Sequence, residues 1–199
     1  MRSMLFQRLA LSKDKKEVLR LSEEGQVIEK PEDIIKDPYI FEFTGLPQLP
    51  VYKEGDLEKA LIDNISKFLL ELGKGFAFMG RQQRINIGGR IFKVDIVFYH
   101  TILKCYVLID LKRGEVQHED IGQMNMYLNY YREEVNTEGD NEPIGIVLGA
   151  YEDKLMVKYA TQNISNKLFV SKYQLYLPNR EQLENEISRF LDNKPKTDA

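Results

Sequence analysis

The chain has 199 residues, a net charge of −3 and one cysteine, with 43% hydrophobic and 30% charged residues. This composition fits one globular domain with an appendage, and it excludes a disordered chain and an intramolecular disulfide. No apolar run approaches the roughly 20 residues that span a bilayer, and no signal peptide precedes the first predicted helix. We therefore expect a protein of the reducing cytoplasm without a membrane partner.

The first fifty residues have the character of an arm. Residues 1–20 combine a few apolar positions with many charges, which predicts a helix with little to pack against. Residues 31–50 contain four prolines and are typical of a linker, or of an arm packed on the main domain or on a second subunit. We expect an arm (1–50), a main domain (51–192) and a polar tail (193–199).

The main domain is predicted to begin with an amphipathic helix. Apolar residues at helical spacing extend over residues 56–72, with Asp56 as the N-cap and Gly73 just after the end. Glu58 lies at the edge of the apolar face. An acid near a helix N-terminus ordinarily complements the helix dipole, and the alternative is a carboxylate turned towards a metal.

Three strands and then alternating helices and strands are predicted to follow. Residues 76–87 and 90–99 form a hairpin through Gly88-Gly89, and residues 105–112 complete a meander. The later elements are a helix at 118–132, a strand at 144–148, a helix at 153–161, a strand at 168–175 and a helix at 180–191. We expect an α/β fold with a mixed central β-sheet flanked by helices.

Charged residues interrupt two of these otherwise apolar strands. Asp95 lies in the second strand, and Asp110 and Lys112 lie in the third, where alternation places them on one face. Because unpaired buried charge is costly, a divalent metal with a phosphodiester substrate would explain them. A structural ion pair at a strand end is the alternative, and for Asp110 and Lys112 alone it is the more common case.

Any metal in this chain must be held by oxygen ligands. Two histidines and one cysteine cannot build a structural zinc site. Mg²⁺, or Mn²⁺ in its place, takes one or two carboxylates and completes its shell with water and phosphate. Asp95, Asp110 and the backbone carbonyl of Leu111 would supply such ligands. Lys112 would orient the attacking water or, with a lowered pKa, act as a base.

Basic residues are concentrated around these carboxylates. Residues 74–113 contain eight basic and two acidic residues, a net charge of +6, which leaves −9 for the remainder. Such a field attracts a polyanion, although surface strands also carry basic residues for solubility. The residues expected at nucleic acid are Arg81, Gln82, Arg84, Arg113 and Tyr127. A structural role for Arg81 and core packing for Tyr127 are the alternatives.

The ordered motif residues resemble the PD-(D/E)XK nuclease superfamily. In chain order they are Glu58, Asp95, Asp110, Lys112, Gln123 and Tyr127. The YhcG type of nuclease domain is more similar still. The segments that look like it are 57–61, 68–73, 80–82, 98–100 and 122–125, within a resemblance over residues 37–177.

The resemblance implies a restriction-endonuclease-like core and Mg²⁺-dependent hydrolysis of DNA, in repair, recombination or defence against foreign DNA. It implies that Asp95 and Asp110 bind metal with help from Glu58, that Lys112 is catalytic, and that Gln123 orients the lysine or the substrate. Fuller-length members carry an N-terminal helical domain, so residues 1–50 would be its end and a docking site for a partner or second copy. A non-catalytic nucleic-acid-binding module and an assembly domain are the alternatives.

Overall fold

The computed structural model describes residues 27–36, 38–41, 44–46, 53–151, 153–162 and 164–175. The helices predicted at 1–20 and 180–191 and the polar tail lie outside these residues. The elements are the 3-10 helix η2 (Pro31–Ile34), β1 (Tyr39–Ile40), α3 (Glu54–Asp63), α4 (Ile65–Leu72), β2 (Phe76–Ile87), β3 (Arg90–His100), β4 (Cys105–Glu115), α5 (His118–Tyr130), the π-helix η4 (Tyr131–Val135), β5 (Ile144–Tyr151), α6 (Lys154–Thr161) and β6 (Lys167–Gln174). Among the helices described, none has the length and apolar character needed to cross a membrane.

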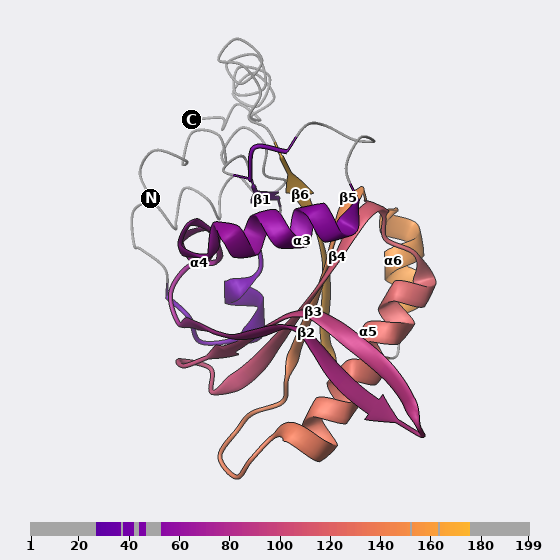
Figure 1. Ribbon diagram of the computed structural model, residues 1–199. Helices are drawn as coiled ribbons and strands as arrows, with labels where there is room; N and C mark the ends of the chain where they lie inside the picture. Colours follow the sequence, from indigo (N-terminus) through magenta and orange to yellow (C-terminus); the bar gives the residue numbers. More distant parts are fainter. Residues whose placement is uncertain are drawn as a thin grey trace, which may run out of the picture.

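One mixed six-stranded sheet organises the molecule (Figure 1). Its strand order is β1-β6-β5-β4-β3-β2, in which β2, β3 and β4 form an antiparallel meander and the other neighbours are parallel. Gly88 and Gly89 connect β2 to β3 with φ angles of 57° and 77°, the pair of positive values that a tight type I′ hairpin turn requires. The α/β class and the meander are confirmed.

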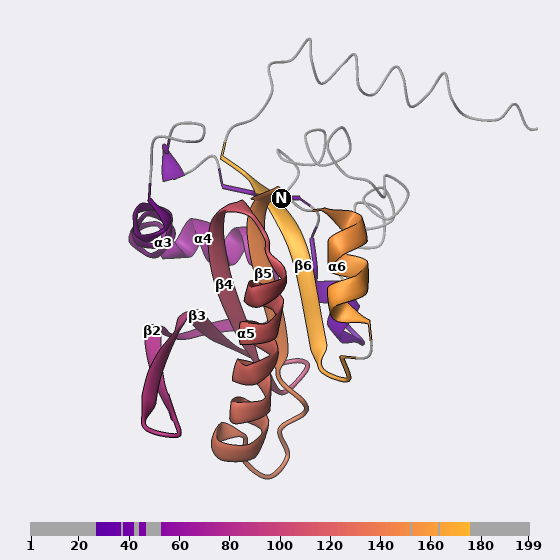
Figure 2. The same ribbon diagram turned by 90° about the vertical axis from the view of Figure 1, so that its right-hand side faces the viewer.

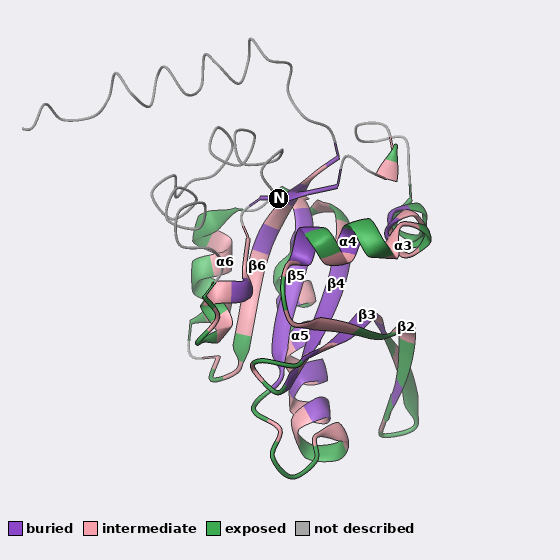
Figure 3. Ribbon diagram, turned by 90° about the vertical axis from the view of Figure 1, so that its left-hand side faces the viewer, coloured by how far each residue is buried: buried purple, intermediate pink, exposed green. Residues whose placement is uncertain are grey.

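Two apolar layers cover the two faces of the sheet (Figure 2). Because side chains alternate along β4, Val107 and Ile109 pack towards α3 and α4, whereas Leu108 packs towards α5. Figure 3 shows β4 and β5 buried along most of their length, and the far end of the β2–β3 hairpin exposed. The sheet is therefore a two-sided core whose antiparallel end extends beyond the helices.

The helix predicted over residues 56–72 is two helices. Asp56 is not the N-cap; it lies at the third helical position, and its carboxylate accepts a hydrogen bond from the Lys53 backbone N–H at 2.8 Å. The chain breaks at Asn64, whose side chain donates to the Ala60 carbonyl at 3.0 Å. Asparagine competes with the helical backbone in this way, which ends α3 and starts α4. Gly73 ends α4 with a φ of 110°, as predicted.

Part of the predicted arm is built into the core. Tyr39 and Ile40 form β1, which pairs in parallel with β6. The Ile40 backbone N–H donates to the carboxylate of Glu71 on α4 at 2.9 Å, and the Ser171 hydroxyl of β6 donates to the Lys36 carbonyl. These contacts differ from the linker that the prolines suggested, and they agree with an arm packed on the main domain.

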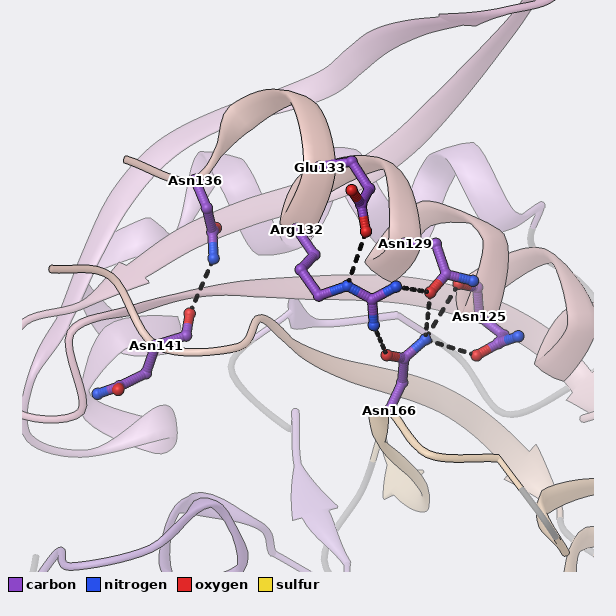
Figure 4. A network of polar contacts seen from close by, with 7 residues as sticks. All are labelled: Asn125, Asn129, Arg132, Glu133, Asn136, Asn141 and Asn166. Carbon is purple, nitrogen blue, oxygen red and sulfur yellow. Dashed lines mark hydrogen bonds and ion pairs between the residues drawn. The ribbon is translucent and has the colours of Figure 1, made fainter. Parts of the chain in front are cut away.

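A network of polar side chains fastens α5 to the segment before β6 (Figure 4). The Asn166 amide nitrogen donates to the side-chain oxygens of Asn125 at 2.7 Å and Asn129 at 3.0 Å. The Asn166 side-chain oxygen accepts from Arg132 at 3.0 Å, and Arg132 also donates to Asn129 at 2.9 Å. The outer side of α5 is thereby fixed by directional bonds, while its inner side packs on the sheet.

Candidate active site

The carboxylates singled out in the sequence lie where β3 and β4 separate. The pairing of these strands runs from His100 opposite Cys105 to Ile96 opposite Ile109, and the next residues are Asp95 and Asp110. The Leu111 backbone N–H donates to Asp95 Oδ2 at 2.8 Å. Since the N–H and C=O of one strand residue point the same way, the Leu111 carbonyl also faces Asp95.

Lys112 lies between two acidic side chains. Its Nζ is 2.9 Å from Asp110 Oδ2 and 3.3 Å from Asp120 Oδ1 on α5. Asp110 is only 4% exposed, so its contact with Lys112 is a largely buried ion pair. Asp120 was not singled out in the sequence. It also accepts a hydrogen bond from the Gln117 backbone N–H at 2.8 Å, and an acid that caps the first turn of a helix is too common to mark a site.

Burial and neighbouring charge act on both members of this pair. Burial, with the charge of Asp95, raises the pKa of Asp110 to about 7 despite the opposing effect of Lys112. Burial alone would lower the pKa of Lys112, but the charges of Asp110 and Asp120 outweigh it and the pKa is raised. Asp110 and Asp120 therefore favour the protonated form of Lys112 in this arrangement, and a lysine pKa lowered beside a bound metal stays a prediction.

Gln82 occupies an unexpected position between two carboxylates. Its Nε2 donates to Glu58 Oε2 at 2.8 Å and to Asp95 Oδ1 at 3.0 Å. Its backbone adopts a left-handed φ of 48°, a conformation that non-glycine residues rarely take and that is enriched at functional sites. The sequence had suggested that Gln82 contacts nucleic acid, whereas this geometry directs its amide into the carboxylate cluster.

Glu58 is joined to Asp95 through this amide. Burial and then the charge of Asp95 raise the pKa of Glu58, against the hydrogen bond from Gln82 and the charges of Arg81 and Lys93. The glutamine amide thus relieves part of the repulsion between two acids that face each other.

The other residues that the sequence predicted for the site lie outside the carboxylate cluster. Tyr127 is 1% exposed and packs edge-on against Phe92, so its ring cannot stack on a base, and the predicted nucleic-acid contact is wrong. Gln123 is half-buried on α5, and its side chain forms no hydrogen bond with any described residue. Basic side chains that remain exposed are Arg81, Arg84 and Arg113.

The oxygen donors present fit a small divalent cation. Among the described residues, no three His, Cys, Asp or Glu side chains are grouped to hold a metal ion. Asp95 lies close enough to Asp110 for its charge to act on it, and strand geometry turns the Leu111 carbonyl towards Asp95. Asp110 is a buried acid whose pKa is raised by burial and by Asp95, so a cation between the two would offset a real electrostatic cost. Two carboxylates are also the usual protein contribution to bound Mg²⁺ or Mn²⁺.

Two solved structures are similar to part of the chain. A repair endonuclease from Pyrococcus abyssi is 20% identical, with a TM-score of 0.45 over 64% of this chain and 50% of that one. EndoMS in a complex with double-stranded DNA is also 20% identical, with a TM-score of 0.46 over 67% of this chain and 49% of that one.

Sequence comparison establishes the family. The family described as the YhcG PDDEXK nuclease domain matches residues 32–188. The YhcG protein of Escherichia coli (strain K12) is 38% identical over 187 residues, which cover 94% of this chain and 49% of that protein. This chain belongs to the YhcG PDDEXK nuclease domain family and has its restriction-endonuclease-like α/β fold. It spans about half the length of the curated relative it matches.

Proposed function

We propose that this chain is a metal-dependent nuclease that hydrolyses phosphodiester bonds of DNA, with Mg²⁺ as its cofactor and Mn²⁺ as a substitute. The observation that carries the proposal is the convergence of Asp95, Asp110 and Lys112 at the point where β3 and β4 separate. Membership of a nuclease domain family supports it. A structural ion pair alone would not require a second acid beside the buried one.

Each side chain has a defined task in this proposal. Phosphodiester hydrolysis needs charge stabilisation, a positioned water and a cation near the attacking oxygen. Asp95, Asp110 and the Leu111 carbonyl would hold the metal, which when bound supplies Lewis-acid stabilisation of charge on the phosphate. Lys112, kept protonated by Asp110 and Asp120, would orient the attacking water and stabilise negative charge on it.

The supporting residues act around this centre. Asp120 holds Lys112 from the side of α5, and Glu58 supports Asp95 through Gln82. Gln123, on the same helix as Asp120, is proposed to position substrate.

The biological setting remains part of the proposal. Exposed Arg81, Arg84 and Arg113 are expected at the DNA backbone. We place the protein in the cytoplasm, in repair, recombination or defence against foreign DNA. Residues 1–50 would contact a partner protein or a second copy, apart from the segment around β1, which packs on the sheet.

Substitutions that keep side-chain size test the reaction centre. Asp110→Asn and Lys112→Met should each lower Mg²⁺-dependent cleavage of plasmid DNA by at least about 100-fold, the usual cost of losing a group that stabilises transition-state charge. The matched control is the exposed Lys59–Asp63 ion pair on α3, changed in the same way, which should cut like the wild type. Circular dichroism checks that all four variants fold. If the Asp110 and Lys112 variants cut as fast as the controls, the proposed reaction centre is wrong.

A second candidate is a nucleic-acid-binding module without catalysis. The lack of a three-acid group among the described residues favours it, as does the Gln82 amide between Glu58 and Asp95. Salt-dependent DNA binding without any turnover in Mg²⁺ or Mn²⁺ would identify this module.

A further inference from the structure

The β2–β3 hairpin carries two basic residues directly opposite each other. Arg84 on β2 and Lys93 on β3 are partners in the strand register, so their side chains are neighbours on one face of the hairpin. Lys93 precedes Asp95 by two residues on the same strand. The basic pair therefore lies next to the acidic site, further towards the hairpin tip.

The two faces of this hairpin have different environments. On one face, Ile85 and Val94 are buried in the apolar layer against α5, and Phe92 packs partly buried beside them. On the other face, Arg84 and Lys93 are exposed. Figure 1 shows the hairpin projecting from the rest of the sheet, and Figure 3 shows exposed residues along its far part. This open face adds nothing to the core.

Fold stability does not explain the basic pair. Like charges directly opposite in a hairpin are destabilising. In the part of the chain that the structure describes, neither Arg84 nor Lys93 forms an ion pair with an acid. Lys93 is also close to the carboxylate cluster. Its charge acts on Glu58 against the rise in pKa that burial and Asp95 cause. An anionic ligand bound over this face would attract both side chains and so offset the repulsion between them.

We infer that the open face of the β2–β3 hairpin, defined by Arg84 and Lys93, binds the sugar–phosphate backbone of the nucleic acid that enters the active site. The identity of the polyanion rests on the proposed function. Contacts to phosphate position a nucleic acid without reading its sequence. The hairpin therefore acts as an electrostatic guide that sets where the backbone lies relative to Asp95.

The salt dependence of DNA binding measures these contacts. A fluorescein-labelled DNA duplex is titrated with protein in EDTA, so that no cleavage occurs, and anisotropy is recorded over a series of salt concentrations. Each phosphate contact contributes about 0.9 to the slope of log K against log salt. The double variant Arg84→Gln and Lys93→Gln should therefore make this negative slope shallower by about 2 and weaken binding to unrelated sequences equally.

A matched variant controls for net charge. Lys67 on α4 and Lys167 on β6 are exposed, and their joint change to glutamine removes the same two charges elsewhere on the molecule. This control should keep the wild-type slope. The hairpin variant should melt at or above the wild-type temperature, because a like-charge pair is removed. Equal slopes in the hairpin and control variants would overturn the inference.

Cleavage is measured in parallel, so the two proposals can fail separately. If the wild type never cleaves in Mg²⁺ or Mn²⁺ but the hairpin variant loses the expected slope, the guide is supported and the nuclease proposal fails. If the wild type cleaves and the slope does not change, the nuclease proposal stands and the guide fails.

Discussion

Gln82 changes what Glu58 can contribute to metal binding. The amide nitrogen lies 2.8 Å from Glu58 and 3.0 Å from Asp95, so it fills the space in which a shared cation would have to touch both acids. Asp95 receives a second hydrogen bond from Leu111, so donors bind both of its oxygens. In the proposed site, Glu58 would then orient Gln82, and Gln82 would orient Asp95, as hydrogen-bonded neighbours of metal ligands do.

A double-mutant cycle on Mn²⁺ affinity tests this chain of contacts. Gln82→Ala should weaken Mn²⁺ binding, measured by calorimetry without DNA, by about 10- to 100-fold because Asp95 loses an orienting donor. Glu58→Ala should weaken binding in the wild type but have no further effect when Gln82 is already alanine.

Two outcomes of the double-mutant cycle would contradict this chain of contacts. If Glu58→Ala still weakens binding in the Gln82→Ala background, Glu58 contacts the metal directly. If the wild type binds no Mn²⁺, the metal site itself is wrong. Glu58→Gln is the conservative control, since an amide oxygen still accepts the hydrogen bond from Gln82, and it should retain most of the affinity.

His100 has a structural role away from the reaction centre. Its ring is fully buried, with Nδ1 accepting from the Leu103 N–H at 3.1 Å and Nε2 3.0 Å from the Lys74 carbonyl, which assigns the proton to Nε2. A side chain on Gly75 would collide with the ring, because a Cβ there would lie 2.6 Å from it. The ring therefore packs as a neutral group at the far end of β3.

This histidine should make stability depend on pH. Burial lowers the pKa of His100, against the raising effect of its bond to Lys74. A depressed pKa means that the unfolded chain takes up the proton first, so the contribution of His100 is full above about pH 6.5 and is lost as pH falls below it. Urea unfolding above and below that pH should show a steeper loss for the wild type than for His100→Phe. Equal losses would contradict this role.

The sequence was enough to predict the positions of some site residues but not of others. Asp110 and Lys112 share a face because alternation in a strand is a local rule. Gln82 could not be placed, since its role depends on a left-handed backbone and on contacts to α3 and β3. Tyr127 has the spacing of a site residue, but its burial is decided by packing against the hairpin.

At the scale of elements, α5 depends on Asn166 for its outer attachment. One amide group joins Asn125, Asn129 and Arg132, which come from successive turns of the helix and its continuation (Figure 4). Asn166→Ala removes these hydrogen bonds and should lower the free energy of unfolding by about 1–3 kcal/mol. Urea unfolding measures the loss. Asn86→Ala, an exposed asparagine on the hairpin, should change stability by less than about 0.5 kcal/mol. Equal losses in the two variants would mean that the network does not hold α5.

The observed bounds of an element agree with the predicted ones where a glycine turn ends the element. The bounds of β2 coincide with the prediction, because Gly88-Gly89 ends the strand and an alternating run precedes it. The helix from 56 to 72 was predicted as continuous because its apolar face continues through the break. A local bond made by Asn64 divides it, and periodicity does not register such a bond.

At the scale of the whole molecule, the segment before α3 belongs to the core. Ile34, Tyr39, Ile40 and Phe41 are fully buried, and Phe41 stacks on Tyr173 at 5.7 Å between ring centroids. The strand of this segment, β1, pairs with β6, which is distant in the sequence. A parallel pairing over this separation leaves no local pattern, and the prolines around the segment indicate a linker instead. Sequence reasoning therefore left open an arm packed on the main domain but could not identify the residues that pack in the core.

Two truncations test whether the domain can form from residue 51 onward. A fragment of residues 27–199 keeps the four buried side chains, and a fragment of residues 51–199 loses them together with β1. Each fully buried apolar side chain contributes about 1.5–3 kcal/mol, so the four together are comparable with the entire stability of about 5–15 kcal/mol of a typical domain. The shorter fragment also lacks the Ile40 N–H that donates to the Glu71 carboxylate. We expect the longer fragment to unfold cooperatively on heating and the shorter one to show little or no transition by circular dichroism. Equal melting temperatures would place the start of the domain at residue 51, as the prolines suggested, and would reduce β1 to an accessory strand.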